Sequence, residues 1–179
     1  DTTATAATAA TATAAEIDHA RYRTAAHAGH ATHPGRAAGG LAFWVAAIRE
    51  SFEEAGVLLA YGPDGEIVDL DHHAGRERWG EHRTAVDTGA RRLIEVCEAE
   101  GLRLAVDGMH YFGHWITPEG APRRYDTRFF LAAAPTRQTP LHDDHEVIAN
   151  EWVRPAEAIE RVFAGELTMM PPTISCLRA

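Results

Sequence analysis

The spacing of apolar residues over positions 41–57, LAFWVAAIRESFEEAGV, predicts an amphipathic helix. Apolar side chains recur there at intervals of three and four residues, which places them on one face of a helix. Gly56 is suited to the left-handed residue that commonly ends a helix. The apolar face consists of Leu41, Trp44, Val45, Ile48, Phe52 and Ala55. We therefore expect this helix to pack against the core of the domain.

Short apolar runs and longer helical patterns alternate along the rest of the chain, as is typical of an α/β domain. A helical pattern covers 76–100, with Gly80 and Gly89 as local weak points. Two shorter helices are expected over 155–163 and after Pro171. Strands are expected over 57–61, 67–70, 102–106, 110–117, 127–133 and 147–153.

The first forty residues contain no alternating or β-branched apolar run that would predict a strand, and they begin with a low-complexity Ala/Thr stretch. Three histidines at intervals of three could form a metal-binding helix face. Gly29 and Pro34 interrupt that helix, so a polar loop is favoured. These histidines are His27, His30 and His33. The sequence therefore divides into a low-complexity or insert segment over 1–38 and a folded domain over 39–179.

Composition restricts the partners of this chain. Its 179 residues carry a formal net charge of −9, which argues against nucleic acid or an anionic membrane as the main partner. No apolar run reaches the length of about eighteen residues that would suggest a transmembrane helix, and no signal peptide is recognisable. Cys97 and Cys176 lie far apart without a CxxC motif, so neither a disulfide framework nor a zinc site is indicated. We expect a soluble cytoplasmic protein.

Three glutamates gather on the side of the 41–57 helix that is opposite to its apolar face. Glu50, Glu53 and Glu54 are three and four residues apart, so their carboxylates lie close together. Glu53 and Glu54 also occupy the last turn, where the helix dipole disfavours negative charge, and Arg49 is the only local cation. Clustered carboxylate oxygens are the ligands that Mg²⁺ requires. The pattern therefore favours a metal site over a solvated acidic face.

The segment RESFEEAGV, residues 49–57, resembles the second half of the Nudix hydrolase signature, R-E-U-x-E-E-x-G-U, in which U is an aliphatic residue. Ser51 stands where the first aliphatic residue is usual. The resemblance implies an α-β-α sandwich with a mixed sheet that hydrolyses a diphosphate linked to another group. It also implies that Glu50, Glu53 and Glu54 hold Mg²⁺ or Mn²⁺ or activate water, and that Arg49 orients these carboxylates.

The first half of the signature fits less well. Counting back from Arg49 places Gly35 at the first glycine, but Leu41 then stands where a glutamate belongs. Either one acidic ligand is missing or Gly35 is a chance match. The second is favoured, because some Nudix members carry an insertion between the glycine pair and the helix. The chain resembles that branch, which includes the peroxisomal coenzyme A diphosphatases.

The likeness to this branch includes the stretches ITPEGAPRRYDTRFFLA, NEWVRPAEAI and AGELTMMPPT. It runs from Gly39 to the C-terminus. Nudix domains begin with strands and the glycine pair, and no strand is predicted before the helix. The resemblance therefore implies that the chain opens inside the insertion and that the sheet is incomplete at its N-terminal side.

Other charged residues are candidates for the same site. Arg123 and Arg124 could bind phosphates by forked hydrogen bonds, or one of them could pair with Asp126 or a helix glutamate, and the two interpretations weigh equally. Nudix enzymes often supply one more acid from a loop on this side. Glu146 is therefore the candidate for a general base or an extra ligand, with Glu151 as the second choice.

Two further runs could carry function, but each has a simpler structural interpretation. A mixed acidic and imidazole run could be a ligand cluster, although such a run is more often a polar loop: Asp69, Asp71, His72 and His73. Aromatic rings in the 110–117 strand could stack on a base, although burial in the core is the more common role: Tyr111, Phe112 and Trp115.

Together with the three glutamates of the 41–57 helix, the resemblance implies a Mg²⁺-dependent hydrolase that cleaves a diphosphate linkage in a nucleoside diphosphate derivative. Coenzyme A or an acyl-CoA is the first substrate that the resemblance implies. The alternative is a nucleotide-binding module that keeps the fold while catalysis is impaired, which Leu41 and the missing glycine pair would favour. The expected partner is a small-molecule diphosphate, and a homodimer is compatible with the family.

Overall fold

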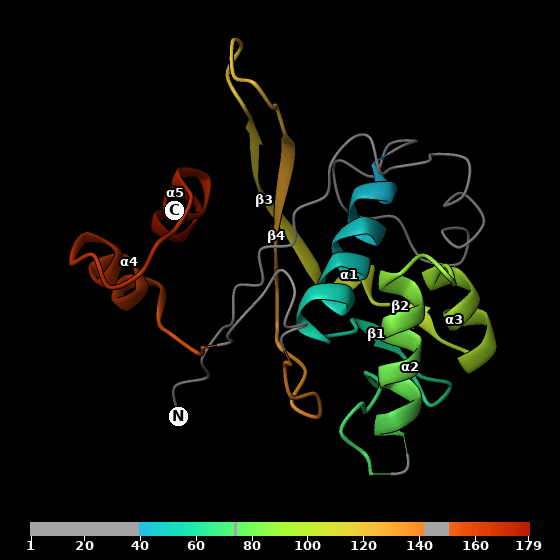
Figure 1. Ribbon diagram of the computed structural model, residues 1–179. Helices are drawn as coiled ribbons and strands as arrows, with labels where there is room; N and C mark the ends of the chain where they lie inside the picture. Colours follow the sequence, from blue (N-terminus) through green and yellow to red (C-terminus); the bar gives the residue numbers. More distant parts are fainter. Residues whose placement is uncertain (1–39, 74, 142–150) are drawn as a thin grey trace.

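A computed structural model describes residues 40–73, 75–141 and 151–179 (Figure 1). Helix α1 lies between the long β3–β4 hairpin and helix α2, while the C-terminal helices lie on the other side of the hairpin (Figure 1). The elements are α1 (Leu41–Ala55), β1 (Ala60–Tyr61), α2 (Arg76–Asp87), α3 (Leu93–Glu100), β2 (Arg103–Leu104), the 3₁₀ turn η2 (Val106–Gly108), β3 (Met109–Ile116), β4 (Asp126–Ala132), α4 (Pro155–Phe163) and α5 (Pro171–Arg178).

Helix α1 confirms the amphipathic helix that the sequence predicts, and it ends where expected. Gly56 has a φ of 66°. Its N–H donates to the Phe52 carbonyl and the Val57 N–H donates to the Ser51 carbonyl, both at 3.1 Å, which is the Schellman arrangement. Within the predicted apolar face, Leu41 and Ala55 are half-buried and the other residues are buried.

One continuous core joins α1 to α2, α3 and the strands. Ile48, Leu58 and Val96 have no exposed surface, and Phe52 is 1% exposed. The core is therefore centred on the apolar face of α1. Its buried members are Trp44, Ala47, Ile48, Phe52, Leu58, Ala60, Leu70, Trp79, Val86, Leu93, Val96, Cys97, Met109 and Phe130.

The described strands form two separate antiparallel pairs, β1 with β2 and β3 with β4, where the sequence favours one mixed sheet. The predicted strand over 57–61 shortens to two residues because the backbone of Leu58 bonds to a side chain, that of Gln138. The run at 67–70 pairs back only through a bridge between Tyr61 and Ile67. Of the strand expected over 147–153, only 151–153 is described, and it is not a strand.

The prediction of one helix over 76–100 is wrong. Two helices, α2 and α3, replace it, with a turn at 88–92 between them. Gly89 has a φ of 70°, a left-handed conformation that cannot continue a helix. Gly80, the other predicted weak point, remains helical. Because the chain reverses at this turn, α3 as well as α2 contributes buried side chains to the core.

The aromatic residues of β3 are more exposed than the sequence predicts. Tyr111 is 46% exposed, Phe112 40% and Trp115 38%. The physical reason is that β3 pairs only with β4 among the described strands, so much of the hairpin projects beyond the core (Figure 1). A register shift near Phe112 marks a bulge in the hairpin. Trp44 of α1 covers part of the hairpin and packs edge-on against Phe130.

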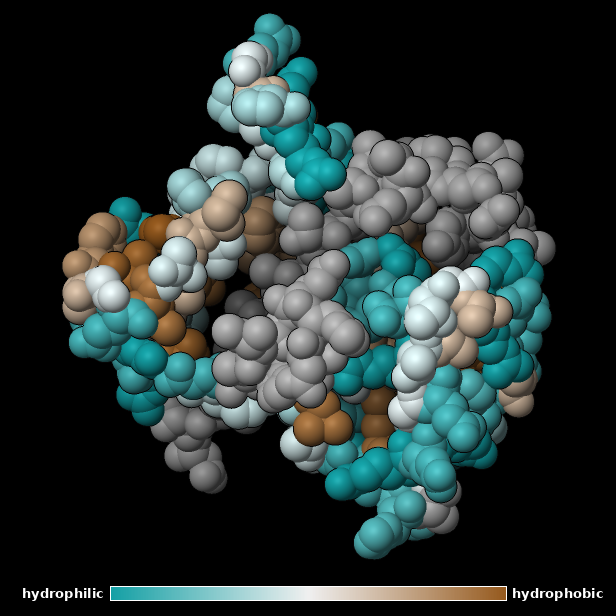
Figure 2. All heavy atoms as spheres, in the orientation of Figure 1, coloured by the Kyte–Doolittle hydropathy of each residue, from teal (hydrophilic) through white to brown (hydrophobic). Residues whose placement is uncertain are grey.

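Both C-terminal helices begin as the sequence predicts, with proline in the first turn of α4 and of α5. Hydrophobic surface gathers over these helices, whereas the face formed by α2 and α3 is mainly hydrophilic (Figure 2). Phe163 is 68% exposed and Met170 is 71% exposed.

None of the described helices combines the length and the apolar character that crossing a bilayer requires.

The two cysteines are expected to differ in reactivity. Cys97 is 3% exposed, and its burial raises the pKa of the thiol to about 11. Cys176 on α5 is half-buried, and burial raises its pKa too. Because thiolate content and access set the rate of thiol exchange, a disulfide reagent at pH 8 should modify Cys176 first. It should reach Cys97 only when urea unfolds the chain; equal rates in the folded protein would contradict this burial.

Candidate active site

The second half of α1 carries the acidic residues that the sequence singles out. Glu53 is 8% exposed and its Oε1 atom is fully buried, while Glu50 and Glu54 are half-buried. Helix α2 packs against α1 and contributes to this covering. The acidic side of α1 is therefore not an open solvated face. A carboxylate is held in a buried position only where compensating groups stabilise its charge.

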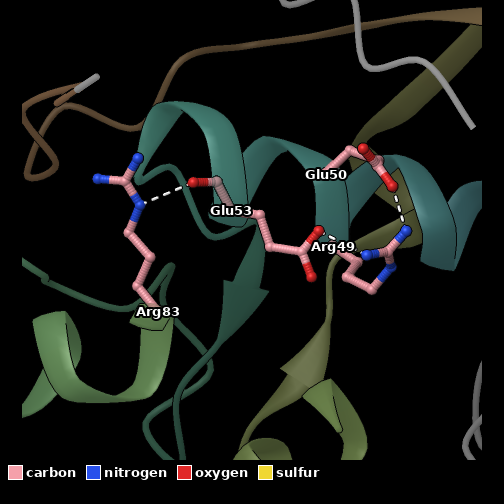
Figure 3. Close-up of polar contacts among 4 residues, drawn as sticks. All are labelled: Arg49, Glu50, Glu53 and Arg83. Atoms are coloured by element: carbon pink, nitrogen blue, oxygen red, sulfur yellow. Dashed lines mark hydrogen bonds and ion pairs between the residues drawn. The ribbon is translucent and has the colours of Figure 1, made fainter. Parts of the chain in front are cut away.

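Arg49 supplies part of that compensation. One nitrogen of its guanidinium, Nη1, donates to Glu53 Oε2 at 2.5 Å, and Nη2 pairs with Glu50 Oε1 (Figure 3). The planar guanidinium thus bridges one carboxylate beside it in sequence and another one turn further along. This pairing forms despite the weaker i to i+4 order of an arginine before a glutamate. Arg49 consequently fixes the direction of both carboxylate groups.

The donor set fits a hard divalent cation by chemistry. Glu50, Glu53 and Glu54 offer carboxylate oxygens, the ligand type that Mg²⁺ and Mn²⁺ prefer. Within the described residues, no three His, Cys, Asp or Glu side chains converge on one point. Arg49 instead provides the positive charge between two of the glutamates. A bound cation would therefore have to share these carboxylates with Arg49 or displace its guanidinium from them.

Arg83 belongs to this site, although nothing in the sequence singles it out. It lies on α2, and its guanidinium donates to the backbone carbonyl of Glu53 at 2.9 Å (Figure 3). It also donates to the backbone carbonyl of Glu54 at 2.9 Å. Thirty residues separate Arg83 from Glu53 in sequence. No local pattern could therefore reveal the contact. The sequence offered one signal: the last turn of α1 carries two glutamates but no basic residue, so a basic residue from elsewhere in the chain could be expected near it.

Ser51 is the point where the chain departs from the aliphatic residue of the signature. It is 5% exposed, and its hydroxyl has no hydrogen-bond partner within the part of the chain that the structure describes. A buried hydroxyl in that situation costs free energy that an aliphatic side chain would not. Its backbone carbonyl nevertheless accepts the capping bond from Val57. The serine at this position therefore changes the buried packing of α1 but not the carboxylates of Glu50, Glu53 and Glu54.

Arg123 and Arg124 are not brought to the carboxylates of α1. They lie in the loop that joins β3 to β4, at the far tip of the hairpin (Figure 1). Arg124 donates to the Thr117 carbonyl at 2.9 Å, and Arg123 donates to the Tyr125 hydroxyl at 3.3 Å. These bonds stabilise the turn. The structure therefore offers no support for a phosphate grip by these two arginines at the acidic site.

The alternative partner, Asp126, is also engaged otherwise. Its Oδ1 accepts from Arg128 Nη1 at 2.8 Å and lies 2.6 Å from His114 Nε2. The Arg128 guanidinium stacks over the ring of Phe43, 3.4 Å from its centroid. Arg128, rather than Arg123 or Arg124, is thus the arginine that connects the hairpin to α1.

The acidic and imidazole run at 69–73 forms a turn, which agrees with the simpler interpretation. Asp69 Oδ1 accepts from the backbone N–H groups of Asp71, at 3.0 Å, and His72, at 2.9 Å. Such bonds are typical of aspartate in turns. The described residues of the run do not form a metal-ligand group. Asp69 and His72 instead line an open pocket of about 500 Å³ together with Arg78 and Arg137.

The candidate general base, Glu146, lies outside the described residues. The second choice, Glu151, is exposed and forms an ion pair with Arg161 of α4, at 2.5 Å. The hydrogen bond from Arg161 holds the pKa of Glu151 below its usual value. A carboxylate with a lowered pKa is a weaker proton acceptor. The pairing therefore connects Glu151, which precedes α4, to Arg161 of that helix.

The segment that follows α1 is anchored by a buried amide. Gln138 is 5% exposed; its side chain accepts from the Leu58 N–H at 2.9 Å and donates to the carbonyls of Leu58, at 3.0 Å, and Val68, at 2.8 Å. Three residues further on, the Leu141 N–H donates to the Ala55 carbonyl at 3.0 Å. The 138–141 segment is therefore fixed against the end of α1.

Replacing Gln138 with leucine should destabilise the fold by at least about 2 kcal/mol, because each buried group left without a partner costs about 1–3 kcal/mol. Urea unfolding followed by tryptophan fluorescence would measure the change. Thr139→Ala is the neighbouring control, since Thr139 is exposed and loses only a surface hydrogen bond to Asp71. Equal losses in the two variants would show that the Gln138 bonds do not anchor the segment.

The fold and this site agree with a comparison to known families. The model of the NUDT19 Nudix domain matches residues 4–178, so the chain belongs to this family of Nudix hydrolases. The α/β fold and the family resemblance inferred from residues 49–57 are thereby confirmed. The match also extends to residues well before Gly39, where the resemblance in the sequence was taken to begin.

Two relatives within this family are similar to the chain. The chain is 33% identical over 150 residues to the acyl-coenzyme A diphosphatase NUDT19 of Gallus gallus, which covers 75% of this chain and 39% of that protein. It is 33% identical over 141 residues to the Homo sapiens protein of the same name, covering 74% and 37%. The chain thus spans about two fifths of the length of these relatives.

A solved structure is similar as well. The crystal structure of a NUDIX hydrolase from Alicyclobacillus acidocaldarius has a TM-score of 0.66 and 29% sequence identity. The likeness covers 77% of this chain and 60% of that one. The arrangement of α1 and its neighbouring strands is therefore that of the Nudix fold.

Proposed function

We propose that this chain takes part in hydrolysis of a diphosphate linkage in coenzyme A or an acyl-CoA, with a divalent cation held by Glu50, Glu53 and Glu54. The observation that supports it best is the buried Glu53 carboxylate, oriented by Arg49 at the end of α1 in a member of the Nudix hydrolase family. The relatives named acyl-coenzyme A diphosphatase support the substrate class.

The chemistry assigns distinct tasks to the residues of α1. A Mg²⁺ or Mn²⁺ ion bound there would offset the charge of the diphosphate and lower the pKa of a water molecule. Glu50, Glu53 and Glu54 would hold the ion through their oxygens. Arg49 would keep Glu50 and Glu53 in one fixed direction, as it does in the structure.

The reaction needs one proton acceptor in addition. The oxygen of water forms a bond to one phosphorus, the bond from that phosphorus to the bridging oxygen breaks, and two phosphate monoesters result. A carboxylate must accept the proton that the attacking water loses. Glu146 is our candidate for this task, since the hydrogen bond from Arg161 lowers the pKa of Glu151 and makes that carboxylate a poorer proton acceptor than an ordinary glutamate.

The proposal is tested with the purified full chain, Mg²⁺ or Mn²⁺, and a panel containing coenzyme A, an acyl-CoA, a nucleotide sugar and a dinucleotide. We expect metal-dependent turnover, fastest for the coenzyme A derivatives and abolished by a chelator. Chromatography of the two phosphate monoester products would measure it. A chain that turns over none of the four diphosphates in either metal would contradict the proposal.

A nucleotide-binding module with impaired catalysis is the second candidate. Two features favour it: Leu41 stands where a signature glutamate belongs if Gly35 is the first glycine of the signature, and Arg49 is paired with Glu50 and Glu53 while no three acids converge among the described residues. This alternative predicts that calorimetry detects coenzyme A binding while the same sample shows no turnover.

A further inference from the structure

We infer that Arg83 is a positioning residue for the acidic end of α1: its guanidinium, supplied by α2, fixes the backbone from which Glu53 and Glu54 project. The catalytic consequence of this inference rests on the proposed function. Its structural part rests on two hydrogen bonds, from Arg83 Nε to the Glu53 carbonyl and from Nη2 to the Glu54 carbonyl, both 2.9 Å long.

These two carbonyls belong to the end of a helix, where the last backbone acceptors have no partner within the helix. The five backbone carbonyls over 51–55 accept hydrogen bonds from four residues outside the helix. Among the donors that the structure describes in residues 40–73, 75–141 and 151–179, Arg83 contributes a side chain, and it serves the two acidic positions. In order, the donors are Val57 N–H for Ser51, Gly56 N–H for Phe52, Arg83 for Glu53 and Glu54, and Leu141 N–H for Ala55.

The charge of Arg83 also addresses an electrostatic problem at this helix end. The last turn of α1 contains no basic residue, although it carries two glutamates where the helix dipole is negative. A guanidinium bonded to the Glu53 and Glu54 carbonyls places a positive charge at that end. Its planar fork matches two successive acceptors, which the single ammonium group of lysine cannot do with the same geometry.

Gly56 leaves the space that this contact needs. A Cβ atom built at position 56 would lie 3.2 Å from Arg83 Nη1, closer than ordinary van der Waals contact. Gly56 also has a φ of 66°, which an L side chain rarely adopts. The glycine of the signature therefore ends α1 and, in this chain, also admits the arginine of α2.

Loss of Arg83 should act on the acids through their backbone. Removing a group that orients ligands typically lowers metal affinity or activity by about 10- to 100-fold. Because Arg83 bonds to main-chain atoms, the effect should appear in metal affinity and kcat. The KM for the organic substrate at saturating metal should change much less.

The test compares Arg83→Met and Arg83→Lys with Arg76→Met in the full chain. Arg76 lies on the same helix and is exposed, and its ion pair with Asp71 is long, at 3.8 Å. Three measurements are made: amide hydrogen exchange over 49–57, Mn²⁺ affinity by electron paramagnetic resonance, and kcat with KM. Urea unfolding identifies variants that remain folded, and Arg83→Lys carries the comparison if Arg83→Met does not fold.

We expect faster exchange over 49–57 and about 10-fold or greater loss of Mn²⁺ affinity or kcat in Arg83→Met. Arg83→Lys should recover part of this loss and Arg76→Met should behave as wild type. Unchanged exchange in folded Arg83 variants, or unchanged metal affinity together with unchanged kcat, would overturn the inference. A wild-type chain without turnover would refute the proposed function instead, and hydrogen exchange would then decide the role of Arg83 alone.

Discussion

Replacing Glu53 with glutamine is expected to lower kcat for the coenzyme A substrate by about 10- to 100-fold or more, because even groups that only orient metal ligands typically contribute that much. Glutamine keeps the size of the side chain but removes the charge that Arg49 pairs with and that a divalent cation requires. Because Glu53 is buried, water is poorly placed to take over its contact with Arg49 or with a cation. Steady-state kinetics at saturating Mg²⁺ would measure the loss, and Glu54→Gln should show a loss of the same kind.

The matched control is Glu81→Gln. Glu81 is exposed on α2, and the same change of charge there should leave kcat within about twofold of wild type, since surface substitutions away from a site have small effects. Urea unfolding of all three variants separates lost chemistry from lost folding. Full turnover by folded Glu53→Gln and Glu54→Gln would show that the catalytic assignment is wrong.

Truncating Phe52 to alanine is expected to lower the free energy of unfolding by about 3–5 kcal/mol. Phe52 is 1% exposed and belongs to the core that joins α1 to α2 and α3. The loss combines the buried surface of the ring with the cavity that remains. It is a large fraction of the total stability of about 5–15 kcal/mol that a domain commonly has. Urea unfolding followed by circular dichroism would measure it.

Phe163→Ala provides the control for the same chemical change. Phe163 on α4 is 68% exposed and contacts the Arg178 guanidinium rather than the core. Its truncation should alter the free energy of unfolding by about 1 kcal/mol or less, because little apolar surface leaves water at this position. Similar losses at positions 52 and 163 would mean that the apolar face of α1 is not the centre of the core.

The sequence predicts α1 well because the determinants of that helix are local. The apolar spacing from Leu41 to Phe52 and the glycine at 56 each act within a few residues of chain. The same holds for α4 and α5, whose starts are marked by proline. The break between α2 and α3 was visible as Gly89, but a single glycine is tolerated in many helices and its left-handed φ could not be read from the sequence.

Contacts between distant residues could not be predicted in this way. Arg83 reaches α1 from α2, and Gln138 replaces a strand partner for Leu58 from eighty residues away. The two arginines proposed to bind phosphate, Arg123 and Arg124, were chosen by their place beside a strand. That choice could not show that the hairpin would carry them to its tip, where both bond to the turn itself.

The exposed rings of β3 illustrate the same limit. Alternating and aromatic residues predict a strand correctly, but burial depends on what covers the strand. Tyr111 and Trp115 lie on a hairpin whose two strands pair only with each other among the described residues. Their exposure is thus a property of the tertiary arrangement and not of the local sequence.

Titration with Mn²⁺, followed by electron paramagnetic resonance, tests most directly whether the acids of α1 form a metal site. The wild-type chain is compared with the Glu53→Gln/Glu54→Gln double variant, with Mg²⁺ as a competitor. We predict saturable Mn²⁺ binding by the wild type that Mg²⁺ displaces, and a loss of affinity of at least about 10-fold in the double variant. Identical binding curves for the two proteins, or no binding by the wild type, would contradict the account.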